Sequence, residues 1–371
     1  MTETLYRRPL SPDAIAFSSP EGRRLFGEAL GSGGLDGYFP LAEQFHTQAD
    51  PMFCGLGSLV VALNALAIDP GRPWKGAWRW FAEDLLDCCV ALEEVRRRGL
   101  DLDELACVAR CNGADVLLHR PTLDQLDEFR GALATAARGD AVMIASYDRG
   151  SLDQTGTGHA SPVGGYHAAR DLVLILDVAR FKYPPHWLPT PRLLQAMQPI
   201  DPATGRPRGF LLLRPRASGV SLGFNLRCEG EDLKGLARRI ASVVSEASPT
   251  ASIEELARSL VPLTEHLAVR DPDTPSHQAT LLAIRKLAAY PRIREAVGAP
   301  QADAVLVFLL TVADRLPPAR KDEVTAIVAE AARDAALAGE IGSLQKQLGA
   351  LWEVAALDHA DDERSLRPAP E

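Results

Sequence analysis

The stretch QFHTQADPMFCGLGSLVVALNAL, residues 44–66, places one cysteine, Cys54, directly before a segment that is apolar almost all round. Such a segment is typical of a helix that is buried on every side. A thiolate at the start of a helix is stabilised by the helix N-terminus, which lowers the pKa of the cysteine. Gln48, six residues earlier, can donate an N–H to a developing oxyanion, and the backbone N–H of Cys54 can donate the second. The stretch therefore predicts a nucleophilic cysteine at the start of a buried helix.

Two later segments supply the partners that a nucleophilic cysteine needs. His159 follows Gly158 at the expected start of a strand, and a glycine there leaves room for a substrate backbone. Asp177 directly follows the apolar run Leu172–Leu176, where a carboxylate can accept a hydrogen bond from an imidazole and hold its orientation. The order Cys, His, Asp is the papain arrangement, although the spacings are shorter than the roughly 130–150 residues of papain-type enzymes.

The distribution of apolar runs predicts an α+β protein with two domains. Helical patterns come first, and short apolar runs at residues 141–146 and 209–213 follow as expected strands. We expect a papain-like fold, with a helical part and an antiparallel sheet, over residues 1–217. Residues 218–357 are rich in good helix formers and predict an all-helical C-terminal domain. The charged, Pro-containing tail 358–371 is expected to be disordered.

Composition excludes several classes of partner. The chain has 371 residues and a formal net charge of -9, so it lacks the basic surface of a nucleic-acid-binding protein. Its apolar runs are far shorter than the ~20 residues that cross a bilayer, and no apolar signal segment opens the chain. Six cysteines are few for a disulfide framework, so we expect reduced thiols and a cytoplasmic location.

Longer strings around these residues resemble the phytochelatin synthases, a family of the papain-like clan. The resemblance is dense from about residue 4 to 215 and is carried by residues 45–48, 54–56, 63–72, 74–76, 86–89, 154–159 and 176–187. It implies that Cys54 is the nucleophile, His159 the base, Asp177 the orienting acid and Gln48 the oxyanion donor. The expected substrate contacts are Gly158 and the positions that the resemblance associates with glutathione: Arg149, Arg180, Lys182, Tyr183, Asp201 and Arg208.

The activity implied by the resemblance is that of a glutathione γ-glutamylcysteinyltransferase in heavy-metal detoxification. The Cys54 thiolate attacks the Cys–Gly amide of glutathione, His159 protonates the departing glycine, and the acyl group passes to a second glutathione or a phytochelatin. The resemblance implies no organic cofactor, a homodimer, and activation by cadmium, zinc or copper, mainly as the glutathione thiolate complex. Two alternatives stay open: a hydrolase that releases glycine from glutathione or its conjugates, and a non-catalytic thiol protein that binds metal.

Four further cysteines are candidate metal ligands: Cys88, Cys89, Cys107 and Cys111. The last two lie one helical turn apart and could bind a soft metal ion, but no histidine or second CxxC accompanies them at zinc-finger spacing. We therefore favour buried small hydrophobic side chains and keep metal binding as the alternative. The core or the wall of a groove is the expected place of three tryptophans: Trp74, Trp78 and Trp80.

Overall fold

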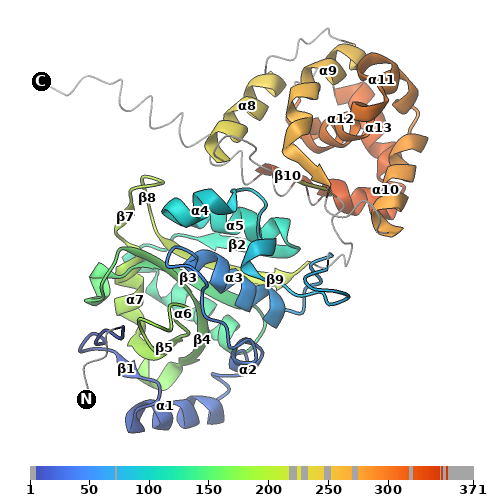
Figure 1. The fold of residues 1–371 in the computed structure, drawn as a ribbon. Coiled ribbons are helices and arrows are strands. Elements are labelled where there is room, and N and C mark those ends of the chain that lie inside the picture. Colours follow the sequence, from blue (N-terminus) through green and yellow to red (C-terminus); the bar gives the residue numbers. More distant parts are fainter. Residues whose placement is uncertain are drawn as a thin grey trace, which may run out of the picture. The chain divides into compact units, whose positions relative to one another are not determined.

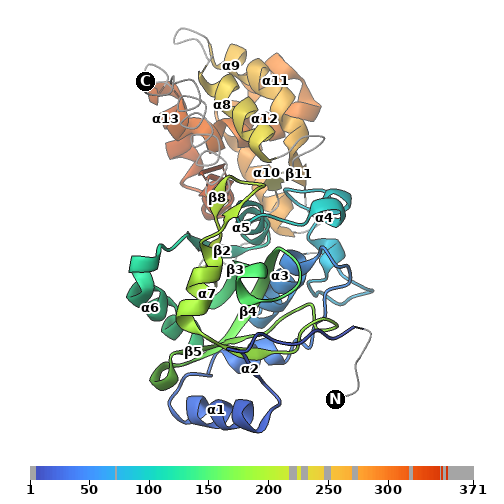
Figure 2. The ribbon, with the colours of Figure 1, turned by 90° about the vertical axis from the view of Figure 1, so that its left-hand side faces the viewer.

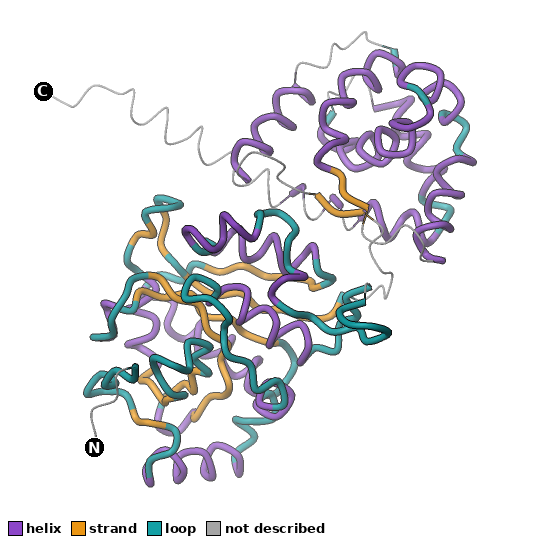
Figure 3. Tube along the Cα trace, viewed as in Figure 1, coloured by secondary structure: helices purple, strands orange, loops and turns teal. Residues whose placement is uncertain are grey.

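The computed structural model describes residues 6–71, 73–216, 224–226, 233–245, 252–269, 275–316, 321–342, 344–345 and 348–349 (Figure 1). The chain divides into two compact units, one made of Met1–Asp87 with Leu92–Arg216 and the other of Cys88–Ala91 with Ala217–Glu371. Figure 3 shows that helices and strands are mixed in the first unit, whereas the second is mostly helical. The predicted domain limits at 217/218 and 357/358, and the predicted disordered tail, lie outside the described residues.

One seven-stranded sheet organises the first unit. Its strand order is β1-β6-β5-β4-β3-β9-β2, and every neighbouring pair is antiparallel. The strands are β1 (Ile15–Ala16), β2 (Ala114–His119), β3 (Val142–Asp148), β4 (Gly158–His167), β5 (Leu172–Ile175), β6 (His186–Pro189) and β9 (Gly209–Pro215). A separate hairpin consists of β7 (Ile200–Asp201) and β8 (Arg206–Pro207). The predicted strands in the first unit and the α+β class are confirmed.

Helices pack on both faces of this sheet. They are α1 (Pro20–Gly31), α2 (Tyr38–Ala42), α3 (Cys54–Ala65), α4 (Leu92–Arg98), α5 (Leu102–Cys111), α6 (Leu126–Ala137) and α7 (Thr190–Met197). Helix α3 packs against β3 and β4, and Figure 2 shows α6 on the opposite side of these strands. Local sequence defines several helix starts, since Ser19 caps α1 and Asp101 forms a capping box with Glu104 in α5.

The predicted burial of α3 is confirmed and positions the start of the helix. Every residue from Gly55 to Leu63 is buried, as expected for a helix that is apolar all round. The hydroxyl of Ser58 donates a hydrogen bond of 3.0 Å to the carbonyl of Ala160 in β4. Because Ser58 lies one turn after Cys54, this bond holds the start of α3 beside the start of β4.

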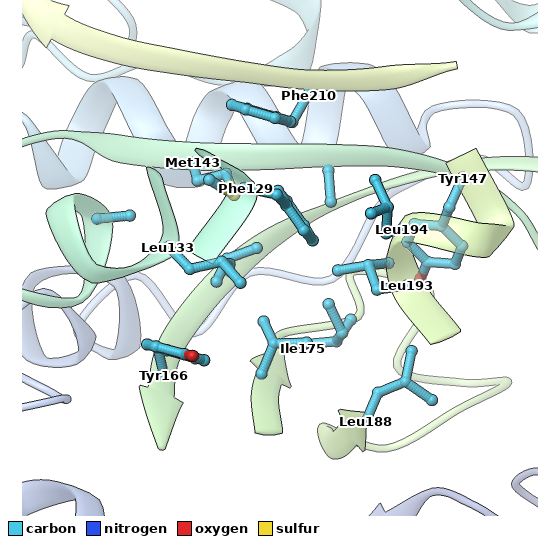
Figure 4. Packing of buried hydrophobic residues seen from close by; sticks show 14 of the residues in the cluster. Phe129, Leu133, Met143, Tyr147, Tyr166, Ile175, Leu188, Leu193, Leu194 and Phe210 are labelled. Carbon is cyan, nitrogen blue, oxygen red and sulfur yellow. The ribbon is translucent and has the colours of Figure 1, made fainter. Parts of the chain in front are cut away.

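The main core of the first unit lies between the sheet and α6 and α7. Figure 4 shows Phe129 from α6, Met143 from β3, Ile175 from β5, Leu193 from α7 and Phe210 from β9 packed together. Burial of each such side chain contributes about 1.5–3 kcal/mol. The strands that carry the candidate site are therefore held by a rigid, apolar layer.

The three tryptophans are not in the core, and their place on the wall of a groove stays a prediction. Trp78 is 77% exposed, and Trp74 and Trp80 are also exposed. Backbone hydrogen bonds between Trp74 and Trp78 and between Trp78 and Lys75 close a tight turn, and the Lys75 ammonium lies 4.6 Å from the centre of the Trp74 ring. The turn directs these rings outward, which aromatic content alone does not reveal.

The second unit has the predicted helical character with one addition. Its helices include α8 (Leu233–Ser245), α9 (Ile253–Leu260), α10 (Pro275–Lys286), α11 (Tyr290–Val297), α12 (Ala299–Val312) and α13 (Lys321–Ala331), and residues 335–342 are helical as well. The addition is an antiparallel pair of strands, β10 (Phe224–Leu226) and β11 (Leu267–Val269), which are too short to show a period of two in the sequence. Helix α12 is buried from Val305 to Val312 and forms the centre of this unit.

No helix in the described part of either unit combines the length and the apolar character that crossing a membrane requires.

Candidate active site

The Cys54 thiol lies at the first residue of α3, as predicted. The preceding turn is closed by two hydrogen bonds of 3.0 Å, from the Phe53 N–H to the Asp50 carbonyl and from the Met52 N–H to the Asp50 carboxylate. Cys54 is partly buried, and its thiol lies close enough to the imidazole of His159 for each group to shift the pKa of the other. Residues far apart in the sequence are thus brought together by the packing of α3 on β4.

Asp177 orients the imidazole of His159. His159 is the second residue of β4, and its Nε2 lies 3.0 Å from Oδ1 of Asp177. Asp177 is the second residue after the end of β5. The same carboxylate oxygen accepts a hydrogen bond of 2.9 Å from the Ala179 N–H. Both side chains are buried. Since Nε2 is directed at Asp177, Nδ1 is the ring nitrogen that can exchange a proton with the thiol of Cys54.

A buried guanidinium completes the environment of Asp177. The Nη2 atom of Arg149 donates to both carboxylate oxygens of Asp177, at 3.1 and 2.8 Å, and Nη1 donates to the side chain of Gln154. The guanidinium also lies over the ring of Tyr183, 4.8 Å from its centre. Sequence reasoning assigned Arg149 and Tyr183 to glutathione, whereas in the structure the guanidinium of Arg149 is bonded to the candidate orienting acid.

These contacts favour a thiolate and an imidazolium. Burial raises the pKa of the Cys54 thiol, but the hydrogen bond and charge of His159, with a smaller effect of Arg149, outweigh burial and lower that pKa. Burial lowers the pKa of His159, but the negative charge of Asp177 outweighs it and raises that pKa. Burial opposes ionisation of Asp177 as well, yet His159 and Arg149 hold its pKa well below the ordinary value. The charged pair is the reactive form of a cysteine nucleophile.

A cavity of about 690 Å³ opens in front of Cys54, entirely within the first unit. Its lining includes Cys54, His159 and Lys182, together with Asp101 at the start of α5 and residues of the β7–β8 hairpin. Both signs of charge are present on these walls. A cavity of this size suits a small, zwitterionic ligand.

Glycines on the approach to β4 make room for two of the cations. A side chain at Gly158 would come within 3.3 Å of Nε and Nη2 of Arg208, and one at Gly156, whose φ is +107°, within 3.3 Å of the Lys182 ammonium. Arg208 is 5% exposed, donates to the Pro199 carbonyl, and its Nε has no hydrogen-bond partner among the described residues. The nearest carboxylate to that Nε is Asp201, at 4.0 Å. The structure thus brings five predicted residues to one cavity: Arg149, Gly158, Lys182, Asp201 and Arg208.

The side chain of Gln48 is buried but does not line the cavity. Its Nε2 donates to the carbonyls of Asp50 and Pro51, at 2.7 and 3.0 Å, so the amide holds the turn before Cys54. Its Oε1 has no hydrogen-bond partner among the described residues. The role of Gln48 as an oxyanion donor stays a prediction.

Comparison with known proteins identifies the family of the chain. A family profile for phytochelatin synthase matches residues 5–210. The chain belongs to the phytochelatin synthase family. It is 48% identical over 266 residues to glutathione gamma-glutamylcysteinyltransferase 1 of Triticum aestivum, which covers 71% of this chain and 53% of that protein. It is 50% identical over 230 residues to the protein of the same name in Arabidopsis thaliana, covering 62% of this chain and 47% of that protein. The Schizosaccharomyces pombe glutathione gamma-glutamylcysteinyltransferase is 38% identical over 269 residues, covering 71% and 65%.

The chain spans about half the length of the plant relatives it matches. The profile ends before β9 is complete, so the family match rests on the first unit. The cavity, the cysteine and its partners all lie in the part that this member shares with the phytochelatin synthase family.

Two predicted substrate contacts of this phytochelatin synthase family member are not on the cavity wall. Arg180 is exposed, and Tyr183 is buried beneath Arg149 with its hydroxyl accepting a hydrogen bond from the Thr155 N–H. The predicted metal ligands are all buried: Cys88, Cys89, Cys107 and Cys111. Burial agrees with the favoured interpretation of these cysteines, and metal binding stays a prediction.

Sequence reasoning missed Glu83. Its carboxylate is 6% exposed and lies close to Gln48 and α3, where it accepts hydrogen bonds from the Ala49 N–H. No local pattern marked it, because its partners are more than thirty residues earlier in the chain. A carboxylate directly after the apolar residues Phe81 and Ala82 was the available signal.

Proposed function

We propose that this chain transfers the γ-glutamylcysteinyl group of glutathione to a second glutathione or to a phytochelatin peptide and releases glycine. The observation that carries the proposal is the imidazole of His159, which is paired with Asp177 and lies beside the thiol of Cys54 at the wall of a charged cavity. The names of the relatives support glutathione as the acyl donor.

Acylation begins with attack of the Cys54 thiolate on the carbonyl carbon of the Cys–Gly amide. The S–C bond forms, and the carbonyl oxygen becomes an oxyanion, for which the Cys54 N–H and Gln48 are the proposed donors. Because the amide nitrogen of Gln48 donates to the carbonyls of Asp50 and Pro51, Gln48 can serve as a donor only after one of these two bonds is released. The imidazolium of His159 then gives its Nδ1 proton to the glycine nitrogen as the C–N bond breaks. Glycine leaves, and the γ-glutamylcysteinyl group is bound to Cys54 as a thioester.

Deacylation uses the same groups in reverse. Neutral His159 accepts a proton from the α-amine of the second glutathione as that amine attacks the thioester carbon. The new amide bond forms, the sulfur leaves as a thiolate, and the thiolate–imidazolium pair is restored. Attack by water instead yields free γ-glutamylcysteine, which is the hydrolase alternative.

The charges of the cavity fit the ends of glutathione. Its γ-glutamyl end carries one ammonium and one carboxylate, and its glycine end a second carboxylate. Arg208 has a free Nε and lies close to Asp201, so this pair suits the γ-glutamyl end. A guanidinium binds a carboxylate with strong, directional hydrogen bonds. Lys182, which also lines the cavity, is the candidate for the second carboxylate.

Heavy metal enters this proposal as part of the substrate. Cadmium, zinc and copper(I) ions bind thiolates, so a metal ion can carry glutathione molecules into the cavity as a thiolate complex. A cytoplasmic, reducing location keeps both Cys54 and glutathione as thiols, and belongs to the same proposal. The homodimer implied by the family resemblance stays a prediction, which analytical ultracentrifugation tests.

One assay separates the alternatives. Purified protein is incubated with glutathione, with and without cadmium, and the products are measured by mass spectrometry, with Cys54→Ser as the control. The transferase produces (γ-Glu-Cys)n-Gly peptides and glycine. Free γ-glutamylcysteine and glycine as the sole products, at every metal concentration, would refute transfer and support the hydrolase. A protein that releases no glycine, and that binds the same amount of metal as Cys54→Ser, would be a non-catalytic thiol binder.

A further inference from the structure

A buried carboxylate outside the cavity supports the segment before Cys54. Glu83 belongs to the short 3₁₀ helix Glu83–Leu85. Its two oxygens accept hydrogen bonds from the Ala49 N–H, at 3.2 and 3.0 Å, and Oε1 is also 2.9 Å from Nε2 of His46. The Glu83 side chain is 6% exposed and that of His46 is 22% exposed. One carboxylate thus holds the backbone of the residue after Gln48 and a side chain two residues before it.

Glu83 is itself fixed to the helix that carries Cys54. The amide of Asn64, near the end of α3, donates 3.0 Å to the Phe81 carbonyl and accepts 3.0 Å from the Phe81 N–H. This two-way pairing holds residues 81–83 along α3. At the other end of the helix, a side chain at Gly57 would come within 3.1 Å of Glu83 Oε1, 3.2 Å of the Gln48 Cβ and 3.4 Å of His46. Glu83, His46 and Gln48 therefore converge on the first turn of α3.

Residues 46–53 depend on this support. The Gln48 N–H donates 3.1 Å to the carbonyl of Val178, the residue after Asp177. The Gln48 amide is held by its nitrogen end alone, since Oε1 has no hydrogen-bond partner among the described residues. The position of the Gln48 amide is consequently set by the backbone of residues 48 and 49. The N–H of Ala49 is the backbone group that donates to Glu83.

We propose that Glu83 is a positioning residue, whose carboxylate holds residues 46–51 against α3 and thereby sets the oxyanion donors opposite the His159 side of Cys54. The inference rests on the proposed function, because it assigns those donors to the acyl-transfer reaction. Glu83 acts through Gln48 and the turn at Asp50, and touches no substrate.

Two probes separate the oxyanion side from the nucleophile. The aldehyde γ-glutamyl-S-methylcysteinal adds the Cys54 sulfur to its carbonyl carbon, and its oxygen takes the place of the oxyanion. Iodoacetamide alkylates the same sulfur with loss of iodide and forms no oxyanion. The inhibition constant of the aldehyde reports on the oxyanion donors, and the rate of Cys54 alkylation, followed by peptide mass spectrometry, reports on the thiolate alone.

The variant is Glu83→Gln, and its matched control is Glu28→Gln. Glu28 forms the same type of pair, since its Oε2 lies 3.0 Å from Nε2 of His167, but it lies on α1 and not on the cavity wall. Loss of a whole oxyanion donor reduces kcat by about 10²–10³-fold. We therefore expect displacement of one donor to reduce kcat by about tenfold. Glu83→Gln should lose that factor in aldehyde affinity and in kcat for glycine release, with KM and alkylation rate unchanged within twofold. Glu28→Gln should match the wild type in all four.

Gln48→Ala extends the test. Because Glu83 acts through Gln48, the double variant should lose no more aldehyde affinity than Gln48→Ala alone, whereas independent roles would add their effects. If Glu83→Gln does not fold, His46→Gln removes only the imidazole and should lose about threefold in aldehyde affinity.

Three results would overturn the inference: Glu83→Gln or its substitute His46→Gln with wild-type aldehyde affinity, an equal loss in aldehyde affinity and alkylation rate, or additive losses in the double variant. Failure of the proposed function would be visible separately, as a wild-type protein that releases no glycine from glutathione.

Discussion

Replacement of Arg149 by methionine tests whether this guanidinium holds Asp177 or binds glutathione. The side chains of Arg149 and Asp177 are 4% and 0% exposed. Removing one partner of such a buried pair costs about 3–5 kcal/mol, because the remaining charge is left without compensation. For a domain of 150–250 residues each kcal/mol lowers Tm by about 2–4 °C, so the expected fall is about 6–20 °C. Arg130→Met is the control, since Arg130 and Asp171 form a pair at the surface that is worth about 0.2–1 kcal/mol.

The same variant has an expected effect on the pH dependence of catalysis. The positive charge of Arg149 lowers the pKa of Cys54 and also that of His159. Without it both pKa values rise, so the acid limb and the alkaline limb of kcat/KM both move to higher pH. Differential scanning calorimetry and the pH profile of glycine release measure the two effects.

One pattern of results would refute this reasoning. If Arg149→Met keeps its Tm within about 2 °C of the wild type, keeps its pH profile and only raises KM, the guanidinium is a substrate ligand. The assignment of Arg149 from the family resemblance would then be the correct one, and Asp177 would owe its position to His159 and the Ala179 N–H alone.

Three further predictions use the same assays. Asp177→Asn removes the charge that raises the pKa of His159, so the alkaline limb of kcat/KM should move to lower pH and kcat should fall at least about tenfold; an unmoved limb contradicts the pairing. Gly158→Ala places a methyl group 3.3 Å from the Arg208 guanidinium, so KM for glutathione should rise by about threefold or more at unchanged Tm; an unchanged KM excludes Arg208 as a ligand. Burial and the charges of Glu104 and Asp103 raise the pKa of Asp101 to about 7 in the folded protein. In the unfolded chain the pKa of an aspartate is about 4, so the free energy of unfolding falls as the pH rises above about 4. Asp101→Asn keeps the helix cap and should be more stable than wild type by about 1 kcal/mol at pH 8 but not at pH 4, as measured by Tm; a gain at both values would exclude ionisation as its cause.

The elements with strong local patterns could be predicted from the sequence. The run after Cys54 is apolar on all sides and forms the buried helix α3, and the run Leu172–Leu176 contains β5. The two-residue strands β1, β7 and β8 could not be predicted, because two residues show no periodicity. The position of β1 depends on its pairing with the distant strand β6, whereas β7 and β8 pair only with each other.

The candidate site shows the same division. The residue types and order of Cys54, His159 and Asp177 indicated the chemistry, and the fold brings these side chains together. The partner of Arg149 could not be predicted, because a basic residue in a glutathione-binding family is expected to face the substrate. Only the tertiary packing of β3 against the segment after β5 directs its guanidinium at Asp177. Glu83 was invisible for the same reason, since Ala49 and His46 reach it through the fold and not through the local sequence.

The place of β9 has a consequence for a chain that is still being synthesised. Although β9 comes last among the strands of the large sheet, it lies between β3 and β2, and β2 has no other neighbour there. Helix α5, which packs on β2 and β9, lacks part of its packing surface until that strand has left the ribosome. A nascent chain that ends before residue 209 therefore contains the thiol, the imidazole and the carboxylate but lacks the strand that joins β2 to β3. The sheet of the first unit is thus completed only when its last strand has been synthesised.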